Sequence, residues 1–133
     1  MNSRLVETEE EDFFFDRLYE GYHEQALCVL KKHPEYIHLV NPDGQTALHL
    51  AAIYCHHSLL GHLLRMGMNP SKQDIDGRTP MHEAARWNHE EAMLILVEFG
   101  ANFHTKDVNG ITPLMEARKA NRNLDLITAY YEI

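Results

Sequence analysis

The chain has 133 residues, of which 44% are hydrophobic and 24% are charged, and this composition is typical of a single globular domain. Twenty acidic residues against 12 basic ones give a formal net charge of −8, which argues against the basic surface of a nucleic-acid-binding protein. The sequence has no apolar run of transmembrane length and no recognisable signal peptide, and its two cysteines are too few for a disulfide scaffold, so a reducing compartment is expected.

Acidic residues are concentrated near the N-terminus. The first 20 residues contain seven acidic and two basic side chains. Charged segments of this kind are usually solvated, so residues 1–9 are interpreted as an acidic leader rather than as a peptide that a partner recruits. Large apolar residues then predict a first helix: Phe13, Phe14, Phe15, Leu18 and Tyr19. Further apolar residues predict a second helix: Ala26, Leu27 and Leu30.

Three later segments repeat with a period of 33 residues: DGQTALHLAA from position 43, DGRTPMHEAA from position 76 and NGITPLMEA from position 109. In each segment, Asp-Gly or Asn-Gly predicts a tight turn, because glycine adopts positive φ readily and the Asp or Asn side chain can bond to its own backbone. A threonine two residues after the glycine is placed to cap a helix, and Pro80 and Pro113 stand at the first helical position. Each unit is therefore expected to begin with a turn and a short helix.

A second helix is predicted in each of the two central units. Its apolar residues come in pairs: Leu59, Leu60, Leu63 and Leu64 in one unit, and Ala92, Met93, Leu96 and Val97 in the next. Gly67 and Gly100 follow these helices, at the position where a left-handed residue ends a helix. One helix pair cannot bury so broad an apolar face alone, so the units are expected to stack into a solenoid.

These segments closely resemble the ankyrin repeat, a 33-residue unit with the pattern D-x-x-G-x-T-P-L-H-x-A-A, followed by G-H and a leucine-rich outer helix. Residues 79–82 (TPMH) and 47–52 (ALHLAA) are close to that pattern. The resemblance implies an all-α ankyrin-repeat solenoid of helix–turn–helix units with hairpin loops, in which two central repeats lie between degenerate N- and C-terminal capping repeats. It also implies one domain over residues 10–133, with repeats at about 10–42, 43–75, 76–108 and 109–133.

The two terminal repeats depart from the pattern. The first has neither Thr-Pro nor Ala-Ala, and its aromatic residues are expected to close one end of the stack. In the last, Arg118 replaces the second alanine, and Arg118, Lys119 and Arg122 are expected to face water. With one inserted residue, the last outer helix would place four side chains on its apolar positions: Leu126, Ile127, Tyr130 and Tyr131.

Histidine is abundant, with ten residues, and raises the question of a metal site. Four ligands of the types that zinc prefers lie close together: Cys55, His56, His57 and His62. In the repeat register, however, Cys55 and His56 fall on the Gly-His turn, and His49 and His82 fall on the histidine of Thr-Pro-Leu-His. The resemblance implies that such histidines bond to neighbouring backbone and hold successive units together, so no metal and no cofactor is expected.

Catalytic motifs are also missing from the sequence. It contains no G-x-S-x-G, no glycine-rich phosphate loop and no cysteine whose local sequence suggests activation. Cys28 lies on the predicted first outer helix and is expected in the core. The sequence therefore predicts a protein that is not an enzyme.

The remaining candidate is the surface of the stack. In this architecture the hairpin tips and the inner helices form a concave face, and the register places ten candidate partner-binding residues there: Asp43, Gln45, Tyr54, Ile75, Asp76, Arg78, Arg86, Trp87, Ile111 and Lys119. Trp, Tyr and Arg are enriched among binding hot spots. Trp87 either contacts a partner or packs over the seam between repeats, and the two roles are compatible. Changing Trp87 or Arg78 is expected to abolish binding and leave the fold intact.

The sequence thus predicts a non-catalytic protein–protein interaction module that binds a protein partner through its concave face, with no role for nucleic acid or membrane. The basic residues Arg78, Arg86 and Lys119 make an acidic or phosphorylated segment the expected ligand. A monomer in the cytoplasm is expected, with the nucleus or a host cell as alternatives. An intracellular regulator that masks an enzyme or transcription factor, or a bacterial effector acting in a host cell, would use the same surface.

Overall fold

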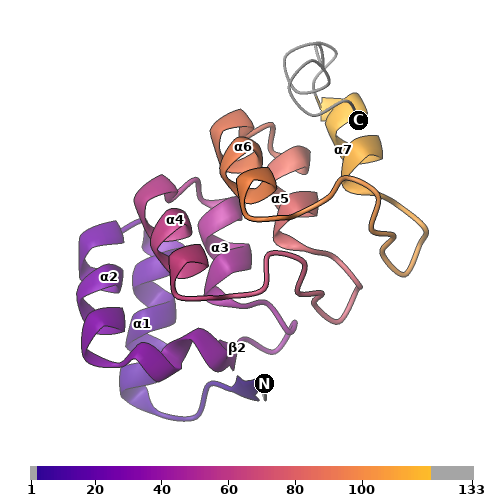
Figure 1. Ribbon diagram of the computed structural model, residues 1–133. Coiled ribbons are helices and arrows are strands. Elements are labelled where there is room, and N and C mark those ends of the chain that lie inside the picture. The colour runs from indigo at the N-terminus through magenta and orange to yellow at the C-terminus, as the bar shows by residue number, and fades with distance from the viewer. Residues whose placement is uncertain (1–2, 121–133) are drawn as a thin grey trace.

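The computed structural model describes residues 3–120, whose helices form two layers (Figure 1). The inner layer contains α1 (Glu9–Glu20), α3 (Ala47–Ile53), α5 (Pro80–Arg86) and α7 (Pro113–Ala120). The outer layer contains α2 (His23–Lys32), α4 (His57–Arg65) and α6 (Glu90–Glu98). Each inner helix packs against the next inner helix, and α2, α4 and α6 follow one another in the same way. This arrangement confirms the predicted all-α solenoid.

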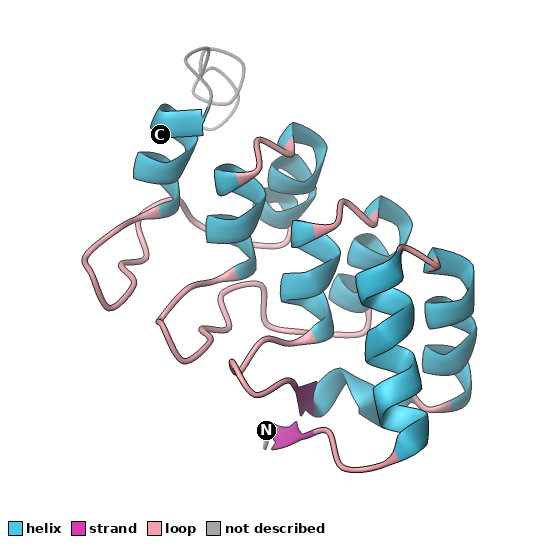
Figure 2. Cartoon of the chain, turned by 180° about the vertical axis from the view of Figure 1, so that it is seen from behind, coloured by secondary structure: helices cyan, strands magenta, loops and turns pink. Residues whose placement is uncertain are grey.

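Loops between successive helix pairs extend to one side of the stack (Figure 2). The first such connection contains a 3-10 helix, η1 (Pro34–His38), and the short strand β2 (Leu39–Val40). Strand β2 pairs in parallel with β1 (Arg4–Leu5), which sequence analysis did not anticipate. The N-terminal segment is therefore tied to the side of the stack from which the loops project.

Threonine caps and small residues explain the inner layer. The hydroxyls of Thr46 and Thr79 accept hydrogen bonds from the backbone N–H groups of His49 and His82, which fixes the start of α3 and of α5. Alanines at equivalent positions are fully buried and let neighbouring helices approach closely: Ala51, Ala52, Ala84 and Ala85. The predicted starts and the predicted packing role of these alanines are confirmed.

The outer layer contributes large apolar side chains to the core. The leucines predicted on α4 are all buried, as are Ala92, Met93 and Leu96 of α6, whereas Val97 is partly buried. Gly67 and Gly100 have φ of 95° and 97°, the left-handed conformation predicted for the ends of these helices.

The N-terminal repeat begins earlier than the 33-residue register indicates. Thr8 caps α1 through a capping box with Glu11, so α1 spans 12 residues, whereas α3 and α5 span seven each. Arg4 of β1 forms an ion pair with the buried Glu11 carboxylate. The leader side chains are mostly exposed, as expected, but this backbone pairing and ion pair anchor the segment that was expected to be a free solvated tail.

Some side chains of the terminal repeats differ from expectation. Phe14 and Phe15 close the core as predicted, but Phe13 is 44% exposed and Tyr19 is 41% exposed. Cys28 is exposed rather than buried, because α2 packs mainly against α1 and η1 and leaves its far side in solvent. Arg118 and Lys119 are exposed as expected. The residues predicted for the last outer helix, and one basic cap residue, lie outside the described residues: Arg122, Leu126, Ile127, Tyr130 and Tyr131.

Candidate partner-binding face

A side chain placed just before each turn organises the three projecting hairpins. The carboxylate of Asp74 accepts hydrogen bonds from the backbone N–H groups of Asp76 and Arg78, both at 2.9 Å. Asn41 and Asp107 accept the equivalent bonds in the neighbouring hairpins. Because one short polar side chain fixes both ends of each turn, all three hairpins adopt the same shape.

Successive hairpins are stacked through their backbones. The N–H of Ile75 donates to the carbonyl oxygen of Asp43 at 3.1 Å, and the N–H of Val108 donates to that of Asp76 at 2.9 Å. A Cβ atom on Gly77, which has φ of 75°, would lie 3.1 Å from the backbone of the next hairpin. Glycine therefore provides both the left-handed turn and the close approach.

Buried histidines link each repeat to the next. In His82 the Nδ1 atom accepts from the N–H of Thr79 at 3.0 Å, so Nε2 carries the proton and donates to the carbonyl of Ile111 at 2.8 Å. His49 bonds in the same way to Thr46 and, at 2.9 Å, to the carbonyl of Arg78. Burial lowers the pKa of both histidines, which agrees with neutral rings.

The histidines of the outer turns have the same role. His56 contacts the carbonyl of Leu18 at 3.0 Å, and His89 contacts that of Ala52 at 2.9 Å. The predicted structural role of these histidines is therefore confirmed. No group of three His, Cys, Asp or Glu residues suited to a metal ion is found within residues 3–120.

Large apolar side chains are exposed at equivalent positions on the hairpins and the inner helices. Ile75 and Val108, each at a hairpin tip, are 65% and 68% exposed, more than any other large hydrophobic residue of the described chain. Trp87 and Tyr54, at the ends of α5 and α3, are 53% and 43% exposed. This exposure recurs at equivalent positions of neighbouring repeats, which makes these side chains candidates for contact with a partner.

Aromatic and cationic neighbours surround these inner-helix residues. The Arg86 guanidinium lies 5.5 Å from the centre of the Trp87 ring. The Tyr54 ring meets that of Tyr19 edge-on at 6.2 Å, and the Asn41 amide donates to the Tyr19 hydroxyl at 2.9 Å. Sequence reasoning missed Tyr19 as a surface residue, because the register aligns it with a buried alanine and the longer α1 was not foreseen.

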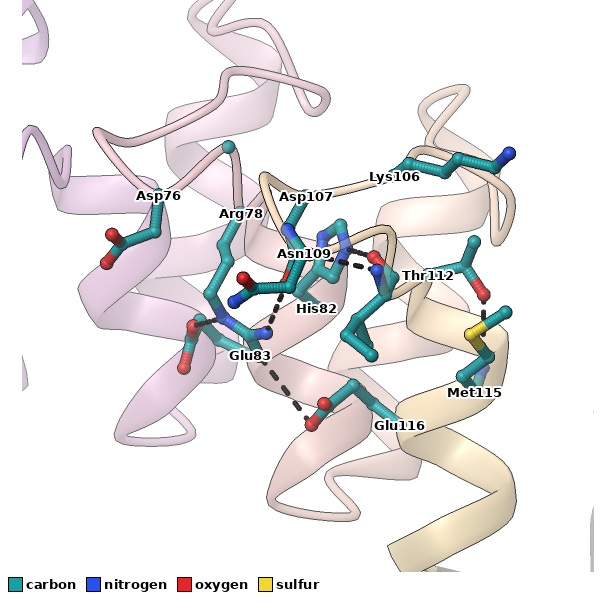
Figure 3. Close-up of polar contacts among 12 residues, drawn as sticks. Asp76, Arg78, His82, Glu83, Lys106, Asp107, Asn109, Thr112, Met115 and Glu116 are labelled. Carbon is teal, nitrogen blue, oxygen red and sulfur yellow. Dashed lines mark hydrogen bonds and ion pairs between the residues drawn. The ribbon is translucent and has the colours of Figure 1, made fainter.

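Arg78 differs most from expectation. Its guanidinium reaches Glu83 of α5 at 2.8 Å, Asp107 of the next hairpin at 3.1 Å and Glu116 of α7 at 3.6 Å (Figure 3). Its side chain is only 13% exposed. Arg78 therefore joins the last two described repeats, so the expectation that it stands exposed on the concave face is wrong, and we no longer expect that it can be changed without affecting the fold.

The charges of this cluster stabilise one another. Burial opposes the charged form of Arg78, but the hydrogen bond and negative charge of Glu83, together with Glu116 and Asp107, raise its pKa. Burial also works to raise the pKa of Asp107, but hydrogen bonds from Ile111 and Asn109 and the charge of Arg78 outweigh it and lower the pKa. The positive charge of Arg78 is thus neutralised by carboxylates of the same chain.

The other predicted residues fall into two groups. Arg86, Ile111 and Lys119 lie with Arg78 around one shallow, polar hollow between α5, α7 and the last hairpin. On the preceding hairpins, Asp43 and Asp76 are exposed, whereas Gln45 is partly buried and accepts a hydrogen bond from the Asn41 amide at 2.9 Å.

Comparison with known proteins agrees with this geometry. A family model described as ankyrin repeats, in three copies, matches residues 18–107. A search of curated proteins found no match to the chain. Within residues 3–120, no helix combines the length and the apolar character that crossing a membrane requires. Because the matched segment is more than half of the sequence and the structure repeats the same unit, the chain belongs to the ankyrin repeat family.

Proposed function

We propose that this protein is a non-catalytic interaction module that binds a partner protein through its concave face. Ankyrin repeats are in general protein–protein interaction modules, and the observation that carries the proposal here is the exposure of Ile75, Val108 and Trp87 in the repeat register. Ile75 and Val108 are presented on hairpins whose backbones are hydrogen-bonded to the preceding hairpin. A preorganised apolar surface binds with little loss of conformational entropy.

An acidic segment is the partner chemistry that the exposed cations beside the hollow favour. Arg86 and Lys119 are both exposed beside the hollow, and Arg86 lies next to Trp87. Arg78 adds nothing to this attraction because three carboxylates surround it. We expect binding to weaken when Arg86 and Lys119 are changed to alanine, with a smaller effect at high salt because screening has already reduced the attraction.

Affinity capture from native cells tests the proposal. Trp87→Ala, which removes an exposed indole, should lower recovery of the specific partner by weakening binding about 30-fold, the effect of a hot spot that contributes about 2 kcal/mol. Phe99→Ala is the matched control, because Phe99 is 40% exposed but follows the outer helix α6. Equal partner recovery with both variants would contradict binding at the concave face.

An inhibitory role would use the same face and is distinguished by a functional assay. If the captured partner is an enzyme or a transcription factor, its activity should fall when the chain is added and return with Trp87→Ala. An adaptor would leave that activity unchanged while still binding.

A further inference from the structure

A cysteine, a histidine and a glutamate lie next to one another beyond the C-terminal end of α3, whereas the hairpin precedes the N-terminal end of that helix. Cys55 occupies the turn between α3 and α4, and its Sγ atom lies 2.8 Å from Nε2 of His57, the first residue of α4. The other ring nitrogen of His57, Nδ1, lies 3.1 Å from a carboxylate oxygen of Glu91 on α6. Two neighbouring repeats therefore build this cluster, and the partner-binding face does not use it.

Hydrogen-bond chemistry assigns the roles within the cluster. A carboxylate only accepts, so the 3.1 Å ion-pair distance to Glu91 favours a proton on Nδ1 of the His57 ring. Nε2 is then left as an acceptor and faces the Cys55 thiol. A thiol beside a base that a third group orients is the arrangement of an activated nucleophile.

Neither the core nor the backbone accounts for a cysteine at this position. The Cys55 side chain is only partly buried, and its φ of 60° lies in the left-handed region. Asn88 occupies the equivalent turn of the next repeat with φ of 57°. Asparagine adopts this conformation far more readily than cysteine, so the cysteine is explained by its thiol rather than by the turn.

We propose that Cys55 is a modification site, a thiol that His57 activates and Glu91 positions for reaction with a small neutral oxidant of the peroxide class. The negative charge of Glu91 disfavours anionic reagents, and the partly buried sulfur disfavours bulky ones. In the reaction His57 takes the thiol proton, the sulfur attacks one peroxide oxygen, and an S–O bond forms as the O–O bond breaks. The leaving hydroxide takes the proton from His57 and becomes water. The sulfur is oxidised to a sulfenic acid as the peroxide is reduced.

Burial raises the pKa of the Cys55 thiol, and the charge of Glu91 adds to this effect. The sulfur therefore keeps its proton at neutral pH until a base removes it. This is why His57 is needed: it acts as the general base for a thiol that its surroundings alone would leave unreactive.

Sulfenic acid formation at each cysteine tests the proposal on the full chain without any partner. The protein is treated with hydrogen peroxide at pH 7 in the presence of dimedone, which traps sulfenic acids, and each labelled cysteine is quantified by mass spectrometry. Cys28 is the internal reference because it is exposed. Cys55 should react about 10-fold faster than Cys28 or more, because general-base catalysis typically contributes a factor of 10² or above. Equal rates would overturn the proposal.

Matched variants separate activation from structural damage. His57→Asn should reduce the Cys55 rate to that of Cys28 or below, whereas His62→Asn on the same helix should not. Glu91→Ala should reduce it less, and Glu98→Ala, on the same helix, should not. Alkaline pH should restore the rate of His57→Asn, because hydroxide then removes the thiol proton. An unchanged rate in His57→Asn at pH 7 would overturn the proposal. Partner binding is not measured, so this outcome is independent of the proposed function.

Discussion

Replacing Arg78 with alanine removes the cation that three carboxylates share. The side chains of Glu83, Asp107 and Glu116 are 7%, 3% and 17% exposed, so little solvent is available to stabilise their charges once the guanidinium is gone. Breaking a buried ion pair by removing one partner costs about 3–5 kcal/mol. Arg78→Ala should therefore destabilise the interface between α5 and α7.

The structure places the cost near the low end of that range. Asp107 keeps the hydrogen bonds from the backbone N–H groups of Asn109 and Ile111, and Glu116 is the least buried of the three carboxylates. We therefore expect a loss of about 3 kcal/mol in the free energy of unfolding, a large part of the total stability of a small domain.

Urea unfolding at pH 7, followed by circular dichroism of the helices, measures this loss. Arg86→Ala is the matched control: it removes the same charge from an exposed position, and we expect it to change stability by less than about 0.5 kcal/mol. If Arg78→Ala and Arg86→Ala unfolded at the same urea concentration, the ion-pair cluster would not stabilise the stack and the reasoning would be refuted.

Two further predictions concern the contacts between repeats. Gly77→Ala should destabilise the protein more than Gly110→Ala. The two glycines have similar φ, 75° and 77°, but of the two only Gly77 would place the new methyl group 3.1 Å from the next hairpin. Equal urea midpoints for the two variants would contradict the close approach. The free energy of unfolding should fall as the pH decreases below 6.5. Burial lowers the pKa of His49, His56 and His82, so the unfolded chain binds more protons than the folded chain in this range. Urea midpoints that stay constant between pH 7.5 and 5.5 would contradict neutral buried histidines.

The repeat units were predictable from the sequence because each depends on local chemistry. The turn at Gly77 and the cap at Thr79 follow from residue types at fixed spacing, the role of His82 follows from the resemblance to ankyrin repeats, and all three are found. The start of α1 was not predictable from the 33-residue register, because Thr8, which caps the helix, precedes the first repeat of that register.

The candidate face was predictable by position but not by environment. The register placed Ile75 and Trp87 at turns and helix ends, and they are exposed there. It also placed Arg78 on this face, but exposure depends on which neighbours reach a side chain, and Glu83 and Glu116 come from positions that were assigned no role. The sequence did contain a signal for this cluster: Glu83 and Glu116 stand at equivalent positions of successive repeats, and Arg78 is close to the first of them.

Site-resolved cross-linking to the captured partner tests the central claim most directly. A photoreactive residue is introduced at Val108, on the tip of the last hairpin, and in a second variant at Leu94, which lies on the outer helix α6. Binding through the concave face predicts that the partner cross-links to position 108 and not to position 94. A partner that cross-links to position 94 and not to position 108 would contradict the claim.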